Sequence, residues 1–131
     1  MSPTAWTSLL VLLTVGLMAW TSFLVGRARA RYGIKAPATT GHPDFERVFR
    51  VQMNTLEACV MFLPALWVAT LYGHPLVNAV GGLVFVGGRV LYALAYMKEA
   101  GRRSAGFAVS SIGFLAVLAN AALGFLRSLA G

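Results

Sequence analysis

Four long apolar stretches make up most of this chain, and they restrict its possible folds more than any other feature. They span residues 3–25, 44–72, 75–97 and 104–126. A helix needs about 20 mostly apolar residues to cross a bilayer, so each stretch is long enough for one crossing. Only 11% of the 131 residues are charged, whereas a typical soluble domain has about 25%. The sequence therefore predicts an all-α integral membrane four-helix bundle, with residues 1–131 as a single domain.

Positive charge is concentrated in two of the three connections between these stretches. The first connection carries Arg27, Arg29, Arg31 and Lys35, and the third carries Lys98, Arg102 and Arg103. The middle turn has no Lys or Arg. Because cytoplasmic loops of membrane proteins are rich in Lys and Arg, we expect both basic loops in the cytoplasm and both termini on the other side. The membrane would be a bacterial inner membrane or the endoplasmic reticulum.

The first stretch follows no basic segment and is long for a secretion signal, so we expect it to be retained as a span. The net charge of +7 is assigned to membrane topology and to contacts with anionic lipid headgroups. No motif for nucleic-acid binding accompanies it. We therefore predict the lipid bilayer as a partner, and no nucleic acid.

Several polar or small residues in or next to the apolar stretches have structural explanations. Cys59 is the only cysteine, so we expect a buried structural thiol and no intrachain disulfide. His42 and His74 each precede a proline and are predicted to cap helices, and no cluster of metal-ligating residues is evident. Asn120 is predicted to link helices. Close helix packing is the expected role of four glycines in the third stretch: Gly81, Gly82, Gly87 and Gly88.

Two stripes of polar residues are less easily explained by structure alone. On a helix, residues three or four apart share a face. One such stripe in the second stretch consists of Arg47, Arg50, Asn54 and Glu57, and one in the third consists of Arg89, Tyr92 and Tyr96. Both lie in the half of their helices next to the basic loops, so the two stripes can meet at a similar depth. Arg103 lies just beyond the end of the second stripe.

These stripes allow a structural and a functional interpretation. In the structural one, Glu57 pairs with Arg50 or Arg89, and Asn54 ties two helices together. In the functional one, the residues bind a ligand, because charged groups in membrane helices are costly and usually find a partner. The set contains more cations than one carboxylate can neutralise. It therefore favours a ligand that bears carboxylates, with Glu57 free to bind an ammonium group.

The polar segments together resemble a known family. FERVFRVQMNTLE (residues 45–57), GRVLYALAY (residues 88–96) and Arg103 are similar to the MAPEG superfamily, the membrane-associated proteins in eicosanoid and glutathione metabolism. The similarity is greatest to the branch that contains leukotriene C4 synthase and microsomal glutathione transferase 2. This resemblance implies a homotrimer of four-helix subunits, with glutathione bound between neighbouring subunits near the cytoplasmic face.

The resemblance also implies roles for individual residues. Glutathione would be bound by Arg29, Arg50, Gln52, Asn54, Glu57, Tyr92 and Tyr96. Arg103 would approach the sulfur as the catalytic residue, although Arg102 is its equally basic neighbour. Ala58 stands where some members of the family carry a tyrosine.

The implied activity is that of a membrane-bound glutathione transferase, with peroxidase activity also possible. Glutathione would serve as co-substrate, without a metal, and the second substrate would be an apolar, membrane-soluble electrophile. A free thiol has a pKa of about 8.5, and a nearby guanidinium lowers that pKa by favouring the thiolate.

Two other functions are compatible with the sequence. The first is a non-catalytic lipid-binding or partner-presenting scaffold of the same fold. The second is a small exporter that uses Glu57 for proton coupling, although the neighbouring arginines would hold that carboxylate charged and hinder a proton switch.

Overall fold

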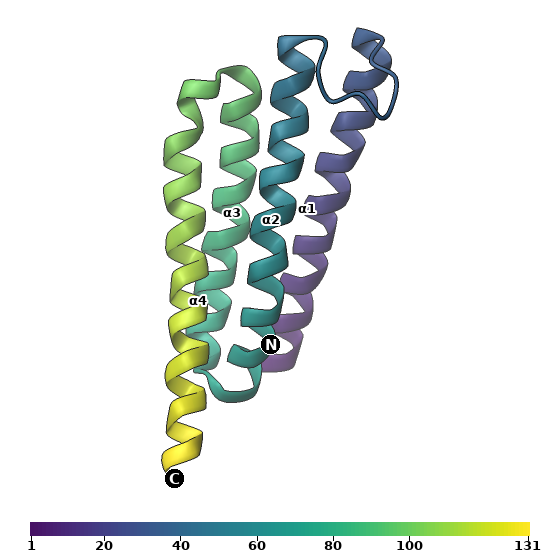
Figure 1. Ribbon diagram of the computed structural model, residues 1–131. Coiled ribbons are helices and arrows are strands. Elements are labelled where there is room, and N and C mark those ends of the chain that lie inside the picture. The colour runs from purple at the N-terminus through teal and green to yellow at the C-terminus, as the bar shows by residue number, and fades with distance from the viewer.

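The computed structural model describes all residues from 1 to 131, and it consists of four long antiparallel helices (Figure 1). These helices are α1 (Pro3–Tyr32), α2 (Pro43–Tyr72), α3 (Pro75–Lys98) and α4 (Ser104–Ala130), and a short 3-10 helix, η1 (Ala100–Arg103), precedes α4. All four long helices are long and apolar enough to cross a membrane. The predicted all-α membrane bundle is thus confirmed at the level of a single chain.

The starts of α2 and α3 have the caps that the sequence predicted. The Nδ1 atom of His42 accepts a hydrogen bond from the backbone N–H of Asp44 at 3.1 Å. His74 does the same for the N–H of Leu76 at 3.3 Å. Each histidine is followed by a proline, which suits the first helical position because no N–H is needed there. The two histidines therefore act as helix caps.

The end of α1 differs from the prediction. The apolar stretch ends at residue 25, but α1 continues to Tyr32 and ends at Gly33, whose φ of 66° is left-handed. Hydrophobicity marks where a span leaves the lipid, whereas the helix itself continues until a residue breaks it. At about 1.5 Å per residue, the 30 residues of α1 exceed the hydrocarbon thickness of about 30 Å. Its basic last turns can thus project beyond the lipid core.

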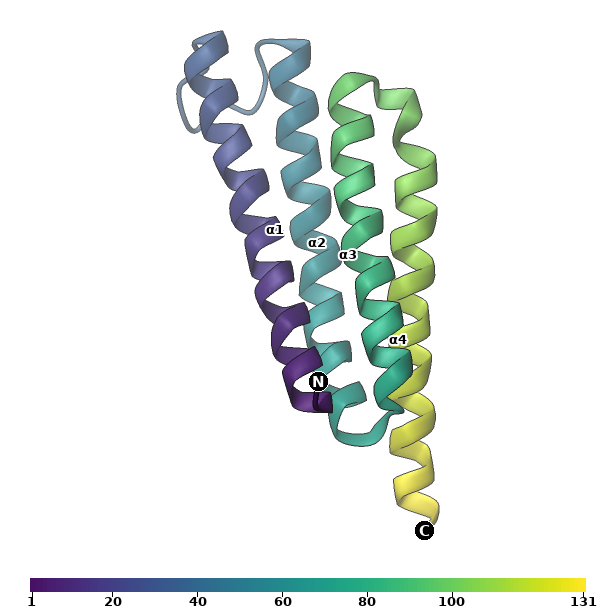
Figure 2. The same cartoon turned by 180° about the vertical axis from the view of Figure 1, so that it is seen from behind.

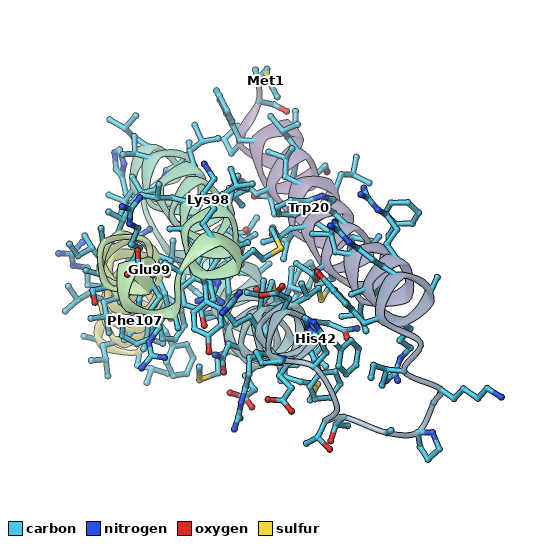
Figure 3. All side chains as sticks on the ribbon, turned by 90° about the horizontal axis from the view of Figure 1, so that it is seen from above. Met1, Trp20, His42, Lys98, Glu99 and Phe107 are labelled. Atoms are coloured by element: carbon cyan, nitrogen blue, oxygen red, sulfur yellow. The ribbon has the colours of Figure 1, made fainter.

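The helices alternate in direction along the chain. Figure 1 shows both basic connections at one end of the bundle, which we call the loop end, and both termini at the other end. From behind, α3 and α4 again lie side by side (Figure 2). Seen from the loop end, α1 is inclined to the other helices, and its start near Met1 lies on the side of α3 (Figure 3). The loop ends of α2, α3 and α4 are therefore neighbours.

Three glycines bring α3 and α4 into backbone contact. A Cβ atom at Gly88 would collide with the backbone of Ser110, and one at Gly106 would collide with the backbone of Tyr92. Gly113 contacts the α3 backbone in the same way. The predicted packing role holds for Gly88 but is wrong for Gly87, because nothing lies within 4 Å of a Cβ added at Gly87. The reason is that adjacent helical residues point about 100° apart.

The interior is apolar, and so is most of the outer surface. Leu10, Phe62, Phe85 and Val117 lie in the largest core cluster, and the rings of Phe62 and Phe85 stack with centroids 3.9 Å apart. Many large apolar side chains are nevertheless exposed, among them Trp67 at 63%. An apolar exterior of this kind suits contact with lipid.

Candidate functional site

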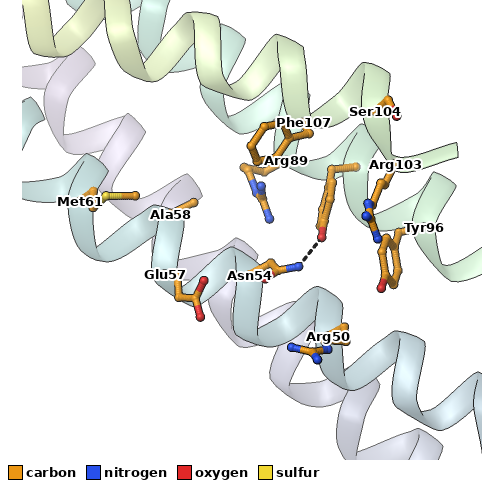
Figure 4. A pocket seen from close by; sticks show the side chains of 11 residues that line it. Arg50, Asn54, Glu57, Ala58, Met61, Arg89, Tyr96, Arg103, Ser104 and Phe107 are labelled. Carbon is orange, nitrogen blue, oxygen red and sulfur yellow. Dashed lines mark hydrogen bonds between the residues drawn. The ribbon is translucent and has the colours of Figure 1, made fainter. Parts of the chain in front are cut away.

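The main cavity of the bundle opens on its side, towards the loop end, and has a volume of about 760 Å³. Its lining comes from three long helices and η1 (Figure 4). The lining residues are Arg50, Asn54, Glu57, Ala58 and Met61 of α2, Arg89, Tyr92 and Tyr96 of α3, Arg103 of η1, and Ser104 and Phe107 of α4. The two polar stripes therefore meet in one place, as their spacing predicted.

The α2 side of this cavity presents an amide, a carboxylate and a guanidinium. Asn54 Nδ2 donates a hydrogen bond to Tyr92 Oη at 2.6 Å and so joins α2 to α3. Arg50 and Glu57 are exposed, and neither takes part in an ion pair. The structural interpretation of Glu57 as the partner of Arg50 or Arg89 is therefore wrong. Its carboxylate is available to a ligand.

Arg47 belongs to the same stripe in sequence but does not line the cavity. Its Nη2 atom is paired with Asp44 instead. Asp44 lies three residues earlier in the first turn of α2, where a carboxylate is favoured by the helix dipole. The cavity therefore begins one turn further along the helix, at Arg50.

Arg89 lines the cavity, although it was not among the ligand-binding residues predicted from the sequence. Its side chain is only 2% exposed. Its Nη2 atom donates to Thr55 Oγ1 at 3.1 Å, and its guanidinium carbon lies 4.1 Å from the centroid of the Tyr92 ring. Its spacing from Tyr92 and Tyr96 placed it in the stripe. That spacing was the signal in the sequence that could have identified it.

The structure distinguishes the two adjacent arginines that follow α3. The guanidinium carbon of Arg103 lies 5.6 Å from the ring centroid of Tyr96, and Arg103 lines the cavity. Arg102 turns away, and its Nε atom pairs with Glu99 at 3.0 Å. Both arginines are exposed, but only Arg103 is placed to contact a molecule in the cavity.

Two of the predicted ligand-binding residues lie elsewhere. Arg29 Nη1 donates to the backbone carbonyl of Ala38 at 2.7 Å, in the loop after α1. Gln52 Nε2 donates to Ser22 Oγ of α1 at 2.9 Å. Gln52 is two residues from Arg50 and so points about 200° around the helix from it. A single chain therefore brings together six of the eight predicted site residues: Arg50, Asn54, Glu57, Tyr92, Tyr96 and Arg103.

A second, apolar cavity of about 280 Å³ adjoins the first. The two cavities share the lining residues Ala58, Met61, Arg89 and Phe107. The remaining lining of the second cavity consists of Phe85, Ser110, Ser111, Phe114 and Leu115. A polar cavity with several cations thus borders an apolar cavity. This arrangement suits a reaction between a water-soluble and a membrane-soluble molecule.

Comparison with known proteins agrees with this architecture. The family model described as "MAPEG family" matches residues 6–123. Human microsomal glutathione S-transferase 2 is 44% identical over 94 residues, which are 72% of this chain and 63% of that protein. Leukotriene C4 synthase of Cavia porcellus is 42% identical over 115 residues, 88% of this chain and 77% of that protein.

An uncharacterised protein of Synechocystis sp. is 44% identical over 124 residues, 95% of this chain and 90% of that protein. The resemblance inferred from the two polar segments and Arg103 is therefore confirmed. With nearly its whole length matched by the family model, this chain belongs to the MAPEG family.

Proposed function

We propose that this protein is a membrane-bound glutathione transferase that activates glutathione as a thiolate for attack on apolar electrophiles or lipid hydroperoxides. The observation that carries the proposal is the polar cavity itself. It gathers three arginines, one carboxylate, an amide and two tyrosines on one side of an otherwise apolar bundle. Two of the relatives are named for glutathione transfer or leukotriene C4 synthesis, which supports a glutathione-dependent reaction.

The charges of glutathione complement those of the cavity. Glutathione carries two carboxylates, one ammonium group and a thiol. Arg50 is exposed and unpaired, so it can bind a carboxylate through charge-assisted hydrogen bonds. Glu57 can accept hydrogen bonds from the ammonium group. The Asn54–Tyr92 hydrogen bond holds two further polar groups at the wall between these charges.

Arg103 is the proposed catalytic residue. A guanidinium beside the sulfur of glutathione lowers the pKa of that thiol, because it stabilises the thiolate more than the neutral form. One pKa unit corresponds to about 1.4 kcal/mol of differential stabilisation. The thiolate is the nucleophile, so Arg103 would raise the fraction of glutathione that can react at neutral pH.

We further propose a homotrimer in which each site lies between two subunits, with the basic loops in the cytoplasm. In this arrangement Arg29 and Gln52 would come from the neighbouring subunit. Neither residue lines the cavity of its own chain, because Arg29 bonds to the loop after α1 and Gln52 bonds to α1. This placement supports the role. The positive charge at the loop end supports the orientation.

The proposal is tested by the ultraviolet absorbance of the thiolate when glutathione is added to detergent-purified protein at neutral pH. We expect a thiolate band with the wild type and with Arg102→Ala, whose arginine is paired with Glu99 outside the cavity. The band should disappear in Arg103→Ala while glutathione still binds. Binding without a band in the wild type would favour the non-catalytic scaffold, and no binding would refute the assignment to glutathione.

A further inference from the structure

Arg89 is the only charged residue buried in the bundle, and no carboxylate forms an ion pair with it. All ion pairs in the structure involve Asp44 or Glu99. The Nε atom of Arg89 is buried and has no hydrogen-bond partner. Charged groups within membrane helices are costly and usually mark a functional site. The protein itself therefore leaves this charge without a counter-ion.

The neighbours of Arg89 orient the guanidinium without neutralising it. Thr55 Oγ1 accepts one hydrogen bond at 3.1 Å, and the Tyr92 ring lies against the guanidinium face at 4.1 Å. A hydroxyl group and an aromatic ring carry no net charge. Both contacts restrict the side chain, and together they leave its remaining donors for a group with negative charge.

The position of Arg89 indicates which molecule would supply the negatively charged group that binds it. Arg89 lines both the polar cavity and the apolar cavity. Figure 4 shows its guanidinium pointing towards α2, beside Phe107. Arg89 lies three residues before Tyr92 on α3, so it is about 4.5 Å further from the loop end. Arg50 and Arg103 are nearer that end, where a water-soluble molecule would enter.

We infer that Arg89 binds the oxygen of the apolar second substrate and stabilises the negative charge that develops on that oxygen during thiolate attack. The inference rests on the proposed function and adds to it a residue that binds the second substrate. That substrate is an apolar molecule with an electrophilic oxygen function, for which a lipid hydroperoxide is the representative. The apolar part occupies the cavity lined by Phe107 and Phe114, and the oxygen lies at its border with the polar cavity.

The reaction with a hydroperoxide balances with glutathione as the only co-reactant. The thiolate attacks the terminal oxygen, so that an S–O bond forms and the O–O bond breaks. The leaving alkoxide is stabilised by Arg89 and takes a proton from water to become an alcohol. A second glutathione then displaces hydroxide from the oxidised sulfur, yielding the disulfide and water. Two thiols are oxidised, and one hydroperoxide is reduced.

The test compares two electrophiles in wild type and Arg89→Met. Cumene hydroperoxide places the developing charge on one oxygen, whereas chlorodinitrobenzene spreads it over a ring and two nitro groups. Because loss of one donor to a developing oxyanion costs about 100-fold or more in kcat, we expect a loss of about that size with the hydroperoxide. The loss with chlorodinitrobenzene should be much smaller. Arg89→Lys should recover part of the hydroperoxide activity, and Arg102→Met should change neither rate.

Thiolate absorbance with glutathione is recorded for every variant, so that the two proposals can fail separately. No thiolate band in the wild type refutes the proposed function and this inference with it. A thiolate band in all proteins, with equal losses of rate on both electrophiles in Arg89→Met, overturns the inference alone.

If Arg89→Met does not fold, Thr55→Val provides a second test, because it removes the hydrogen bond to the guanidinium at nearly constant side-chain volume. In Thr55→Val, a selective loss of rate with the hydroperoxide supports the inference, and equal losses with both electrophiles, or no loss with either, overturn it.

Discussion

At the scale of single residues, Glu57 illustrates how the cavity selects its ligand. It is the only carboxylate in a lining that also contains three guanidinium groups. It is exposed and has no ion pair within the chain. A site with cations alone would accept many anions. One carboxylate among them favours a ligand that combines negative charges with one ammonium group.

We therefore expect Glu57→Gln to weaken glutathione binding by about 10-fold, the size typical of a lost hydrogen bond to a charged group. Isothermal titration in detergent would measure the Kd. Glu99→Gln is the matched control, because that carboxylate pairs with Arg102 outside the cavity. A glutathione analogue without the ammonium group should bind wild type and Glu57→Gln with similar affinity. A persistent difference between the two proteins would contradict the assigned contact.

At the scale of secondary structure, the α3–α4 pair determines the shape of the site. The backbone contact of Gly106 with Tyr92 brings the start of α4 against the tyrosines of α3. Arg103 in η1 and Phe107 in α4 thereby line the same cavity as these tyrosines. Any substitution that pushes α3 and α4 apart should therefore lower the stability of the protein and also disturb the cavity.

Two adjacent glycines of α3 provide a matched test of this packing. Gly88→Ala places a Cβ against the backbone of Ser110, whereas Gly87→Ala meets no atom within 4 Å. We expect Gly88→Ala to destabilise the protein by about 1–3 kcal/mol, as overpacking generally does. Gly87→Ala should be neutral or slightly stabilising, because alanine is the better helix former. Thermal unfolding in detergent would measure both, and equal Tm values for the two variants would contradict the close packing.

At the scale of the whole molecule, the polar ligand residues fall on two separate faces. Six predicted site residues line the cavity, whereas Arg29 and Gln52 contact the loop after α1 and α1 itself. A ring of subunits that each present one face to the next would combine the two sets. The proposed homotrimer is such a ring.

Mixing two inactive variants tests this arrangement. Gln52→Glu places a negative charge on one face, and Arg103→Ala removes the catalytic arginine from the other. We expect each variant alone to be inactive. In a random one-to-one co-expressed mixture, about a quarter of the sites would combine two intact faces, because each site takes one face from each of two neighbours. Transferase activity near zero in the mixture, or full activity of Gln52→Glu alone, would contradict a site shared between subunits.

The helices and their caps could be predicted from the sequence because they depend on local properties. Four apolar stretches longer than a bilayer crossing, with histidine and proline at two of the starts, are sufficient for an antiparallel bundle. The end of α1 was misplaced because the change to basic residues marks the edge of the lipid, whereas the helix continues to Gly33. Helical spacing also predicted that each polar stripe lies on one face of its own helix.

Contacts between helices were decided only by the tertiary structure. Spacing along one helix cannot show that Arg89 bonds to Thr55 on α2 or that Gly87 faces open space. These outcomes depend on the rotation of each helix against its neighbours. That rotation is determined by close packing across the whole bundle. The sequence by itself determined which residues share a face of a helix, and the packed bundle determined which faces enclose the cavity.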